Sequence, residues 1–110
     1  MSTQSAKGYD EFLSTFRMED LAARFAGNFE SGLNACYECC DRYAGSNNVA
    51  LYWEDKDGRS ATYTFDELQV LSARFANFLR ERGIGPGDRV AALLPRIPEL
   101  FVVVLGTWRD

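Results

Sequence analysis

The stretch from Thr64 to Pro95 constrains the fold of this chain more than any other part of it. Thr64, with Glu67 three residues later, has the pattern of a capping box, in which a hydroxyl and a carboxylate each bind a free backbone N–H at a helix start. Apolar residues follow at helical spacing, and Gly83 suits the left-handed position that ends a helix. The apolar residues are Leu68, Leu71, Phe75, Phe78 and Leu79. The stretch therefore predicts one amphipathic helix followed by a glycine-rich turn.

A short strand, Arg89 to Leu94, is predicted after this turn. It is apolar at consecutive positions, as a strand covered on both faces requires, and we expect Val90 and Leu93 to lie beside the buried stripe of the preceding helix. Pro98 and Glu99 suit the first turn of a final helix. That helix is too apolar to stand in water alone. We therefore expect further strands and helices to pack on it, and the chain to be cut from a larger domain.

A β-hairpin is predicted just before the amphipathic helix. Residues 49–54 alternate, with Val49, Leu51 and Trp53 on one face, and residues 61–65 repeat the alternation after a turn that ends in Asp-Gly. We expect Tyr52 and Trp53 to pack within the hairpin. A hairpin, a crossing helix, a buried strand and another helix make an α/β fold.

The N-terminal part is predicted to be helical. Residues 1–8 are small and polar, and we expect them to be disordered. Apolar residues between Tyr9 and Phe25 indicate one or two short helices, and those from Leu33 to Tyr43 indicate a helix with one buried stripe.

Composition and charge argue against several classes of function. The 110 residues carry a net charge of −4 and no basic patch, so nucleic-acid binding has little support. The longest apolar stretch, residues 100–108, is far shorter than the roughly 20 residues of a membrane helix. The N-terminus lacks the apolar core of a signal peptide. We therefore expect a cytoplasmic protein without a nucleic-acid or membrane partner.

The sequence offers little for metal binding or redox chemistry. It has no histidine, which is the commonest general base and metal ligand. Cys36, Cys39 and Cys40 form a C-x-x-C-C cluster without a fourth Cys or His ligand, whereas a structural zinc site normally has four. A redox C-x-x-C would follow a strand, but this one lies in a helical pattern. We interpret the cysteines as reduced thiols on and around a packed helix face.

The glycines of the Gly83–Asp88 stretch are interpreted as turn formers. A phosphate cradle follows a strand and opens a helix, whereas these glycines follow a helix and precede a strand. Asp88-Arg89 is read as a turn acid and a strand-edge base rather than a substrate-binding ion pair. Asp55 and Asp57 are read as hairpin-turn residues rather than metal ligands.

One residue is a candidate for ligand contact. Arg96 lies between two prolines at the C-terminal end of the predicted strand, where open α/β sheets usually bind their ligands. The alternative is a loop arginine that serves solubility. No catalytic residue and no metal ligand is proposed from the sequence.

Three pieces of the chain together resemble the acyl-CoA synthetase branch of the adenylate-forming enzymes, nearest to its acetyl-, propionyl- and medium-chain members. Residues 33–42 resemble its signature LN-x-x-Y-x-x-x-DR. The hairpin and the start of the amphipathic helix, residues 49–68, resemble its first hairpin and first large helix. Residues 87–99 resemble its GDRVA…LP…PE stretch.

The resemblance implies a segment of an acetate–CoA-ligase-like enzyme. Residues 9–48 would be an N-terminal helical segment, and residues 49–110 the truncated start of the AMP-binding, or adenylation, domain. The complete reaction would convert a carboxylate, ATP and coenzyme A to acyl-CoA, AMP and pyrophosphate, with ATP, Mg²⁺ and coenzyme A as cofactors. The partners would be the remainder of that domain and a small carboxylic acid.

The catalytic motifs of that family have no match in this chain. The family holds the ATP phosphates in a Ser/Thr/Gly-rich loop that ends in lysine, the ribose with an aspartate, and drives adenylation with a lysine of its C-terminal domain. The only lysines here are Lys7, in the tail, and Lys56, in the hairpin turn. We therefore expect the chain alone to be inactive and to associate through its final helix. The alternative is a free-standing interaction module whose last helix docks on a partner.

Overall fold

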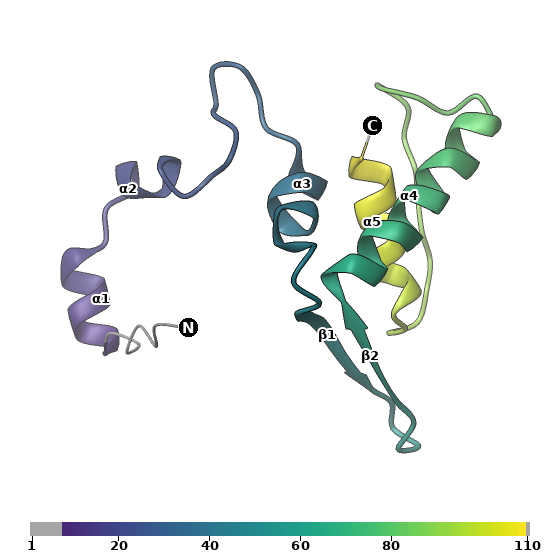
Figure 1. Cartoon of the computed structure of the whole chain (residues 1–110), viewed down its shortest axis with the longest axis horizontal. Coiled ribbons are helices and arrows are strands. Elements are labelled where there is room, and N and C mark those ends of the chain that lie inside the picture. The colour runs from purple at the N-terminus through teal and green to yellow at the C-terminus, as the bar shows by residue number, and fades with distance from the viewer. Residues whose placement is uncertain (1–7, 110) are drawn as a thin grey trace.

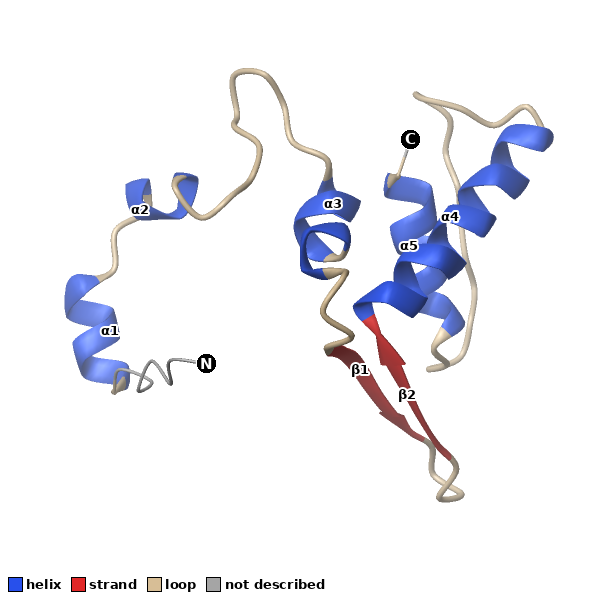
Figure 2. Ribbon diagram, viewed as in Figure 1, coloured by secondary structure: helices blue, strands red, loops and turns tan. Residues whose placement is uncertain are grey.

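The computed structural model describes residues 8–109, so the predicted tail, apart from Gly8, lies outside the described residues. The molecule divides into two regions (Figures 1 and 2). The first, which we call the arm, is residues 8–29, and the second, the body, is residues 33–109. The arm contains α1 (Tyr9–Thr15) and α2 (Glu19–Ala22), and the body contains α3 (Ala35–Cys39), the 3-10 helix η1 (Asp41–Tyr43), β1 (Val49–Glu54), β2 (Ser60–Thr64), α4 (Phe65–Glu81) and α5 (Glu99–Trp108).

The arm extends away from the body (Figure 1). Neither α1 nor α2 buries a residue, and within the described chain neither packs on another helix or strand. Phe12 of α1 instead pairs locally with Phe16, the residue that follows the helix, with ring centroids 5.3 Å apart. The radius of gyration is consequently 16.9 Å, against about 13 Å for a compact domain of this length. The short helices predicted between Tyr9 and Phe25 are confirmed.

The predicted hairpin is confirmed, with one irregularity. Strands β1 and β2 are antiparallel, but the register shifts between Val49 and Leu51. At this bulge Ala50 packs against the core cluster and Val49 is 37% exposed, so the regular alternation expected over residues 49–54 is interrupted at its start. The expected packing of Tyr52 is wrong, because that side chain is 79% exposed.

Both predicted ends of the amphipathic helix α4 are confirmed. At its start the Thr64 hydroxyl accepts from the Glu67 backbone N–H at 3.1 Å, and the Glu67 carboxylate accepts from the Thr64 N–H at 2.8 Å. At its end Gly83 has a φ of 76°, and its N–H donates to the Arg80 carbonyl. The Ile84 N–H donates to the Leu79 carbonyl. This pair of bonds is a Schellman motif, which satisfies the last carbonyls of the helix.

The core lies where α4 crosses α5. The α4 stripe buries Leu68 and Leu79, and the small residues between them, Ser72 and Ala76, are buried as well. A Cβ atom on Gly106 of α5 would lie 2.8 Å from the Ser72 carbonyl oxygen, so only glycine fits there without a shift. The apolar cluster of the core comprises Cys36, Cys40, Leu68 and Leu105, with Ala50, Tyr63, Phe65 and Val102 packed against it.

Two expectations about secondary structure are wrong. Residues 89–94 form no strand, and Leu93 is fully exposed rather than beside the α4 stripe. A strand requires a hydrogen-bonded neighbour, and none of the described residues provides one for this segment. The helix expected from Leu33 to Tyr43 is broken at Cys40 (φ −135°, ψ −66°) into α3 and η1. Beyond the break, Asp41 reaches Arg109.

Among residues 8–109, every helix is either too short or too polar to cross a membrane.

Candidate functional site

A polar cluster at the C-terminal end of α5 joins four segments of the body. The two terminal nitrogens of Arg109 donate to the Asp41 carboxylate at 2.7 and 2.8 Å, and Nη2 also donates to the hydroxyl of Ser72 at 2.8 Å. The hydrogen bonds to Asp41 raise the pKa of Arg109 above its ordinary value. The ion pair is largely shielded from water, with 19% and 14% of the two side chains exposed. We call Asn34, Asp41, Ser72 and Arg109 the clamp.

Asn34 contributes to the clamp by capping two helices at once. Its side-chain oxygen accepts from the Tyr37 backbone N–H at 3.0 Å, which caps the start of α3. Its side-chain nitrogen donates at 3.0 Å to the carbonyl of Trp108, one of the free carbonyls that end α5. A residue near the start of the body thus fixes the last turn of its last helix.

A second polar contact fastens the end of the arm to the body. The Glu38 carboxylate accepts from the backbone N–H groups of Gly27 at 2.7 Å and Ala26 at 3.1 Å, and from Arg42 at 2.6 Å. The hydrogen bond from Gly27 is the largest cause that holds the pKa of Glu38 below its ordinary value. Arg42 also donates to the Arg24 carbonyl at 2.8 Å. The consecutive residues Asp41 and Arg42 therefore each bind other segments of this chain.

The cysteines divide between core and surface. Cys36 and Cys40 are each 1% exposed and belong to the apolar cluster, whereas Cys39 is exposed. Burial raises the pKa of Cys36 and raises the pKa of Cys40 to about 11, so both are protonated thiols at neutral pH. For these two the interpretation as small residues of a packed helix face is confirmed. The described residues contain no group of three His, Cys, Asp or Glu side chains that could hold a metal ion.

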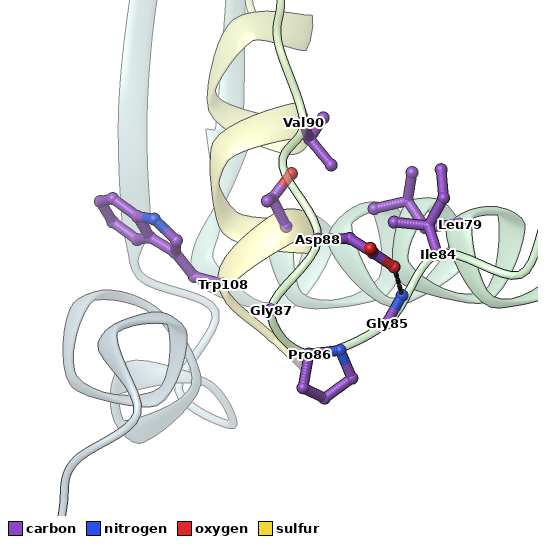
Figure 3. Close-up of a pocket in the computed structure, with 9 residues that line it drawn as sticks. Leu79, Ile84, Gly85, Pro86, Gly87, Asp88, Val90 and Trp108 are labelled. Atoms are coloured by element: carbon purple, nitrogen blue, oxygen red, sulfur yellow. Dashed lines mark hydrogen bonds between the residues drawn. The ribbon is translucent and has the colours of Figure 1, made fainter.

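The glycine-rich stretch closes a turn instead of opening a cradle for an anion. The Gly85 N–H donates to the Asp88 carboxylate at 2.9 Å, and the Asp88 N–H donates to the Gly85 carbonyl at 3.0 Å. Gly87 has a φ of 90°. Figure 3 shows the Asp88 side chain directed at Gly85, beside a cavity of about 250 Å³ that Val90 and Trp108 also line. The interpretation as a turn is confirmed.

Arg96 lies at a cavity beside the hairpin turn. Its carbonyl accepts from the Trp53 indole N–H at 2.7 Å, which fixes the loop before α5 against β1. The cavity is about 500 Å³ in volume, and its lining combines opposite charges with an aromatic ring. The lining residues are Trp53, Glu54, Asp55, Lys56, Asp57, Arg59, Pro95, Arg96 and Ile97. The structure thus places the candidate Arg96 next to a turn that the sequence did not connect with it.

The acidic residues of this turn act as predicted. One Asp55 oxygen accepts from the backbone N–H groups of Asp57 and Arg59, and the other binds the Arg59 guanidinium. Burial alone would raise the pKa of Asp55, but these hydrogen bonds outweigh it and hold the pKa below its ordinary value. Asp55 therefore stabilises the turn, and Lys56 and Arg96 are further cationic residues that line the cavity.

An apolar groove of about 420 Å³ lies beside the core cluster, between α5, β1 and α4. Its wall includes Phe101 and Trp108 of α5, which are 48% and 47% exposed. The exposed face of the last helix that the sequence predicted is thus part of a defined groove.

The polar contacts of Arg109, Ser72 and Glu38 were not predicted from the sequence. Arg109 follows an apolar helix, 68 positions from the aspartate that it binds. Glu38 lies among cysteines in a pattern that suggested only a buried stripe. Their roles depend on contacts between distant segments, which periodicity and local motifs do not encode.

Comparison with known proteins shows the family of this chain. Residues 38–109 match the family described as AMP-binding enzyme. The acetyl-coenzyme A synthetase of Bacillus subtilis is 40% identical over 104 residues, which are 91% of this chain and 18% of that protein. That of Syntrophobacter fumaroxidans is 42% identical over 85 residues, 74% of this chain and 13% of that protein.

A solved structure agrees with these relatives. The crystal structure of a Brucella canis acyl-CoA synthetase matches with a TM-score of 0.81 and 48% identity, covering 92% of this chain and 19% of that one. The chain spans less than a fifth of the length of these relatives. The resemblance inferred from residues 33–99 is confirmed, and the alternative of an unrelated interaction module is not favoured. This chain belongs to the AMP-binding enzyme family, with the acyl-CoA synthetases as its relatives.

Proposed function

We propose that these residues form the structural start of the adenylation domain of an ATP-dependent acyl-CoA synthetase. The complete enzyme would join a small carboxylic acid to coenzyme A, with acetate as the first substrate to test because several relatives are named acetyl-coenzyme A synthetases. The observation that carries this proposal is the joint agreement of sequence and fold with one enzyme class over nearly the whole chain. The division into residues 9–48 and 49–110 remains part of this proposal.

The described residues support a scaffolding role. The polar side chains with the most extensive contacts, those of the clamp and Glu38, bind other parts of this chain. ATP, Mg²⁺ and coenzyme A would serve the complete enzyme. Among the described residues, no group of three His, Cys, Asp or Glu side chains could hold a metal ion, so we assign no Mg²⁺ ligand to them. We therefore assign no step of the reaction to these residues.

Arg96 is the one residue that we propose to contact a ligand. Arg96 lines a cavity together with the Trp53 ring. Its backbone is held there because its carbonyl accepts a hydrogen bond from the Trp53 indole N–H. A guanidinium is suited to bind a carboxylate or a phosphate.

A chimeric enzyme tests the proposed function. Residues 8–109 of this chain replace the matching stretch of the Bacillus subtilis synthetase, and acetate-dependent exchange of pyrophosphate into ATP is measured. We expect exchange clearly above background in the chimera and none from the 110-residue chain alone. A chimera that folds, judged by one cooperative unfolding transition, but catalyses no exchange would count against the proposal.

The chimera also tests Arg96. We expect Arg96→Ala to raise the KM for one substrate while changing kcat little, because a binding contact is lost without a change at the reacting atoms. Arg96→Lys should recover part of the loss. Arg89→Ala, which removes another exposed arginine of the same loop, is the matched control. Unchanged kinetics in Arg96→Ala would show that the Arg96 side chain does not contact a substrate.

A further inference from the structure

The loop before α5 holds Arg96 at the centre of a tight turn. The Ile97 N–H donates to the Pro95 carbonyl at 2.8 Å, which closes a turn of three residues around Arg96. Pro95 and Pro98 flank the turn, and the proline ring fixes the φ angle of each. The backbone of Arg96 is thus restrained by its neighbours along the chain, although its side chain is exposed.

A further restraint on this turn comes from the hairpin. The Trp53 indole N–H donates to the Arg96 carbonyl at 2.7 Å, across 43 positions of the chain. Trp53 is half-buried on β1 and pairs with Ala61 of β2, so the hairpin sets the place of the donor. The Arg96 carbonyl and the Ile97 N–H belong to one planar peptide group. This group is therefore hydrogen-bonded at both its oxygen and its nitrogen.

A fixed backbone matters here because the Arg96 side chain is long and exposed. Such a side chain loses rotamer freedom when a ligand immobilises it, and a backbone that is already ordered keeps the total entropy cost of binding low. Arg59, the other arginine of the cavity lining, is bound by the Asp55 carboxylate. It is therefore less suited than Arg96 to receive an anion.

We propose that Trp53 is the positioning residue of Arg96: its indole N–H holds the loop so that the guanidinium meets the carboxylate or phosphate group of a substrate in the cavity. This inference rests on the proposed function. The acid would supply a carboxylate, and ATP or coenzyme A a phosphate. A bond that merely stabilised the loop would affect the free energy of unfolding and leave substrate binding as it was.

Kinetics of the chimeric enzyme test the inference. Trp53→Phe keeps an aromatic ring but removes the N–H donor, and the KM for acetate, ATP and coenzyme A is measured together with kcat. We expect the KM for one substrate to rise about two- to tenfold, the range that the loss of one neutral hydrogen bond allows, while kcat changes little. Arg96→Ala should affect the same substrate, which identifies the ligand group. The double variant should be no worse than Arg96→Ala alone, because Trp53 acts through the residue that it positions.

A matched control and a second measurement make the result specific. Tyr52→Phe, at the exposed neighbour of Trp53 on β1, should leave every KM unchanged. In the isolated chain, Trp53→Phe should speed amide exchange at Ile97 about fivefold, because its peptide group loses one of two hydrogen bonds, while exchange at Leu79 of α4 stays as it was.

Three results would overturn the inference: an unchanged KM in Trp53→Phe, a rise in KM that adds to that of Arg96→Ala, or unchanged exchange at Ile97. A lower urea midpoint with an unchanged KM would show that the bond is structural only. An inactive chimera would defeat the proposed function instead, and exchange at Ile97, which needs no activity, would still decide whether Trp53 holds the loop.

Discussion

The body and the arm have similar shares of hydrophobic residues but differ in how those residues pack. In the body, α4 and α5 bury a continuous interface and polar fasteners close its ends. In the arm, Leu13 and Phe29 remain 61% and 71% exposed, and within the described chain α1 packs on no other helix or strand. Helices as short as α1 are marginal in water without tertiary contacts.

The difference shows that apolar content alone does not make a folded region. In the body, distant segments meet: Asn34 binds the end of α5, Asp41 binds Arg109, and Trp53 binds the loop before α5. The end of the arm is bound to the body by Glu38 and Arg42. Substitutions should therefore affect the free energy of unfolding strongly in the body and hardly at all in the arm.

The largest effect is expected in the apolar core. Leu68→Ala should lower the free energy of unfolding by about 2–5 kcal/mol, because Leu68 is 4% exposed and its loss leaves a cavity. Phe12→Ala in the arm should change it by less than about 0.5 kcal/mol. Urea denaturation followed by tryptophan fluorescence measures both. Equal losses would show that the arm is part of the cooperative unit.

The second-largest loss of free energy of unfolding is expected in the clamp. Arg109→Ala should cost about 2–4 kcal/mol, because it leaves the shielded Asp41 carboxylate and the Ser72 hydroxyl without their partner. The double variant with Asp41→Asn should be less destabilised than the sum of the two single variants. Strict additivity in this double-mutant cycle would mean that the ion pair contributes nothing.

The helix cap is a smaller and more local test. Thr64→Ala should cost roughly 1 kcal/mol, and Thr64→Ser should restore most of it because serine keeps the accepting hydroxyl. A serine variant as unstable as the alanine variant would assign the loss to the methyl group and not to the cap.

The fastening of the arm predicts a pH dependence. The pKa of Glu38 is lowered in the folded chain, so its contribution is complete above the ordinary glutamate value, about 4.3, and is lost as the pH falls through the lower folded value. In Glu38→Gln the free energy of unfolding should fall less steeply on acidification, whereas Glu81→Gln, at an exposed site, should follow the wild type. Parallel curves for Glu38→Gln and wild type would contradict the assignment.

Local features were predictable from sequence, and features that depend on distant residues were not. The capping box, the Schellman glycine and the hairpin depend on residues a few positions apart, and all three are present. The strand predicted at residues 89–94 is wrong, because a strand also needs a hydrogen-bonded neighbour and none of the described residues provides one. Arg109 could not be found because its partner is 68 positions away. Arg96 was found from its position alone, and its role remains a prediction.

Amide hydrogen exchange tests the central claim most directly, namely that α4 and α5 pack into the body, while α1 packs on no other helix or strand and residues 89–94 have no strand partner among the described residues. In the isolated chain, amides from Ser72 to Leu79 should be strongly protected, and those of α1 and of residues 89–94 should exchange nearly as fast as in an unfolded peptide. In the active chimera, residues 89–94 should become protected while α4 stays as it was. Fast exchange at 89–94 in both proteins, or protection of α1 equal to that of α4 in the isolated chain, would contradict the account.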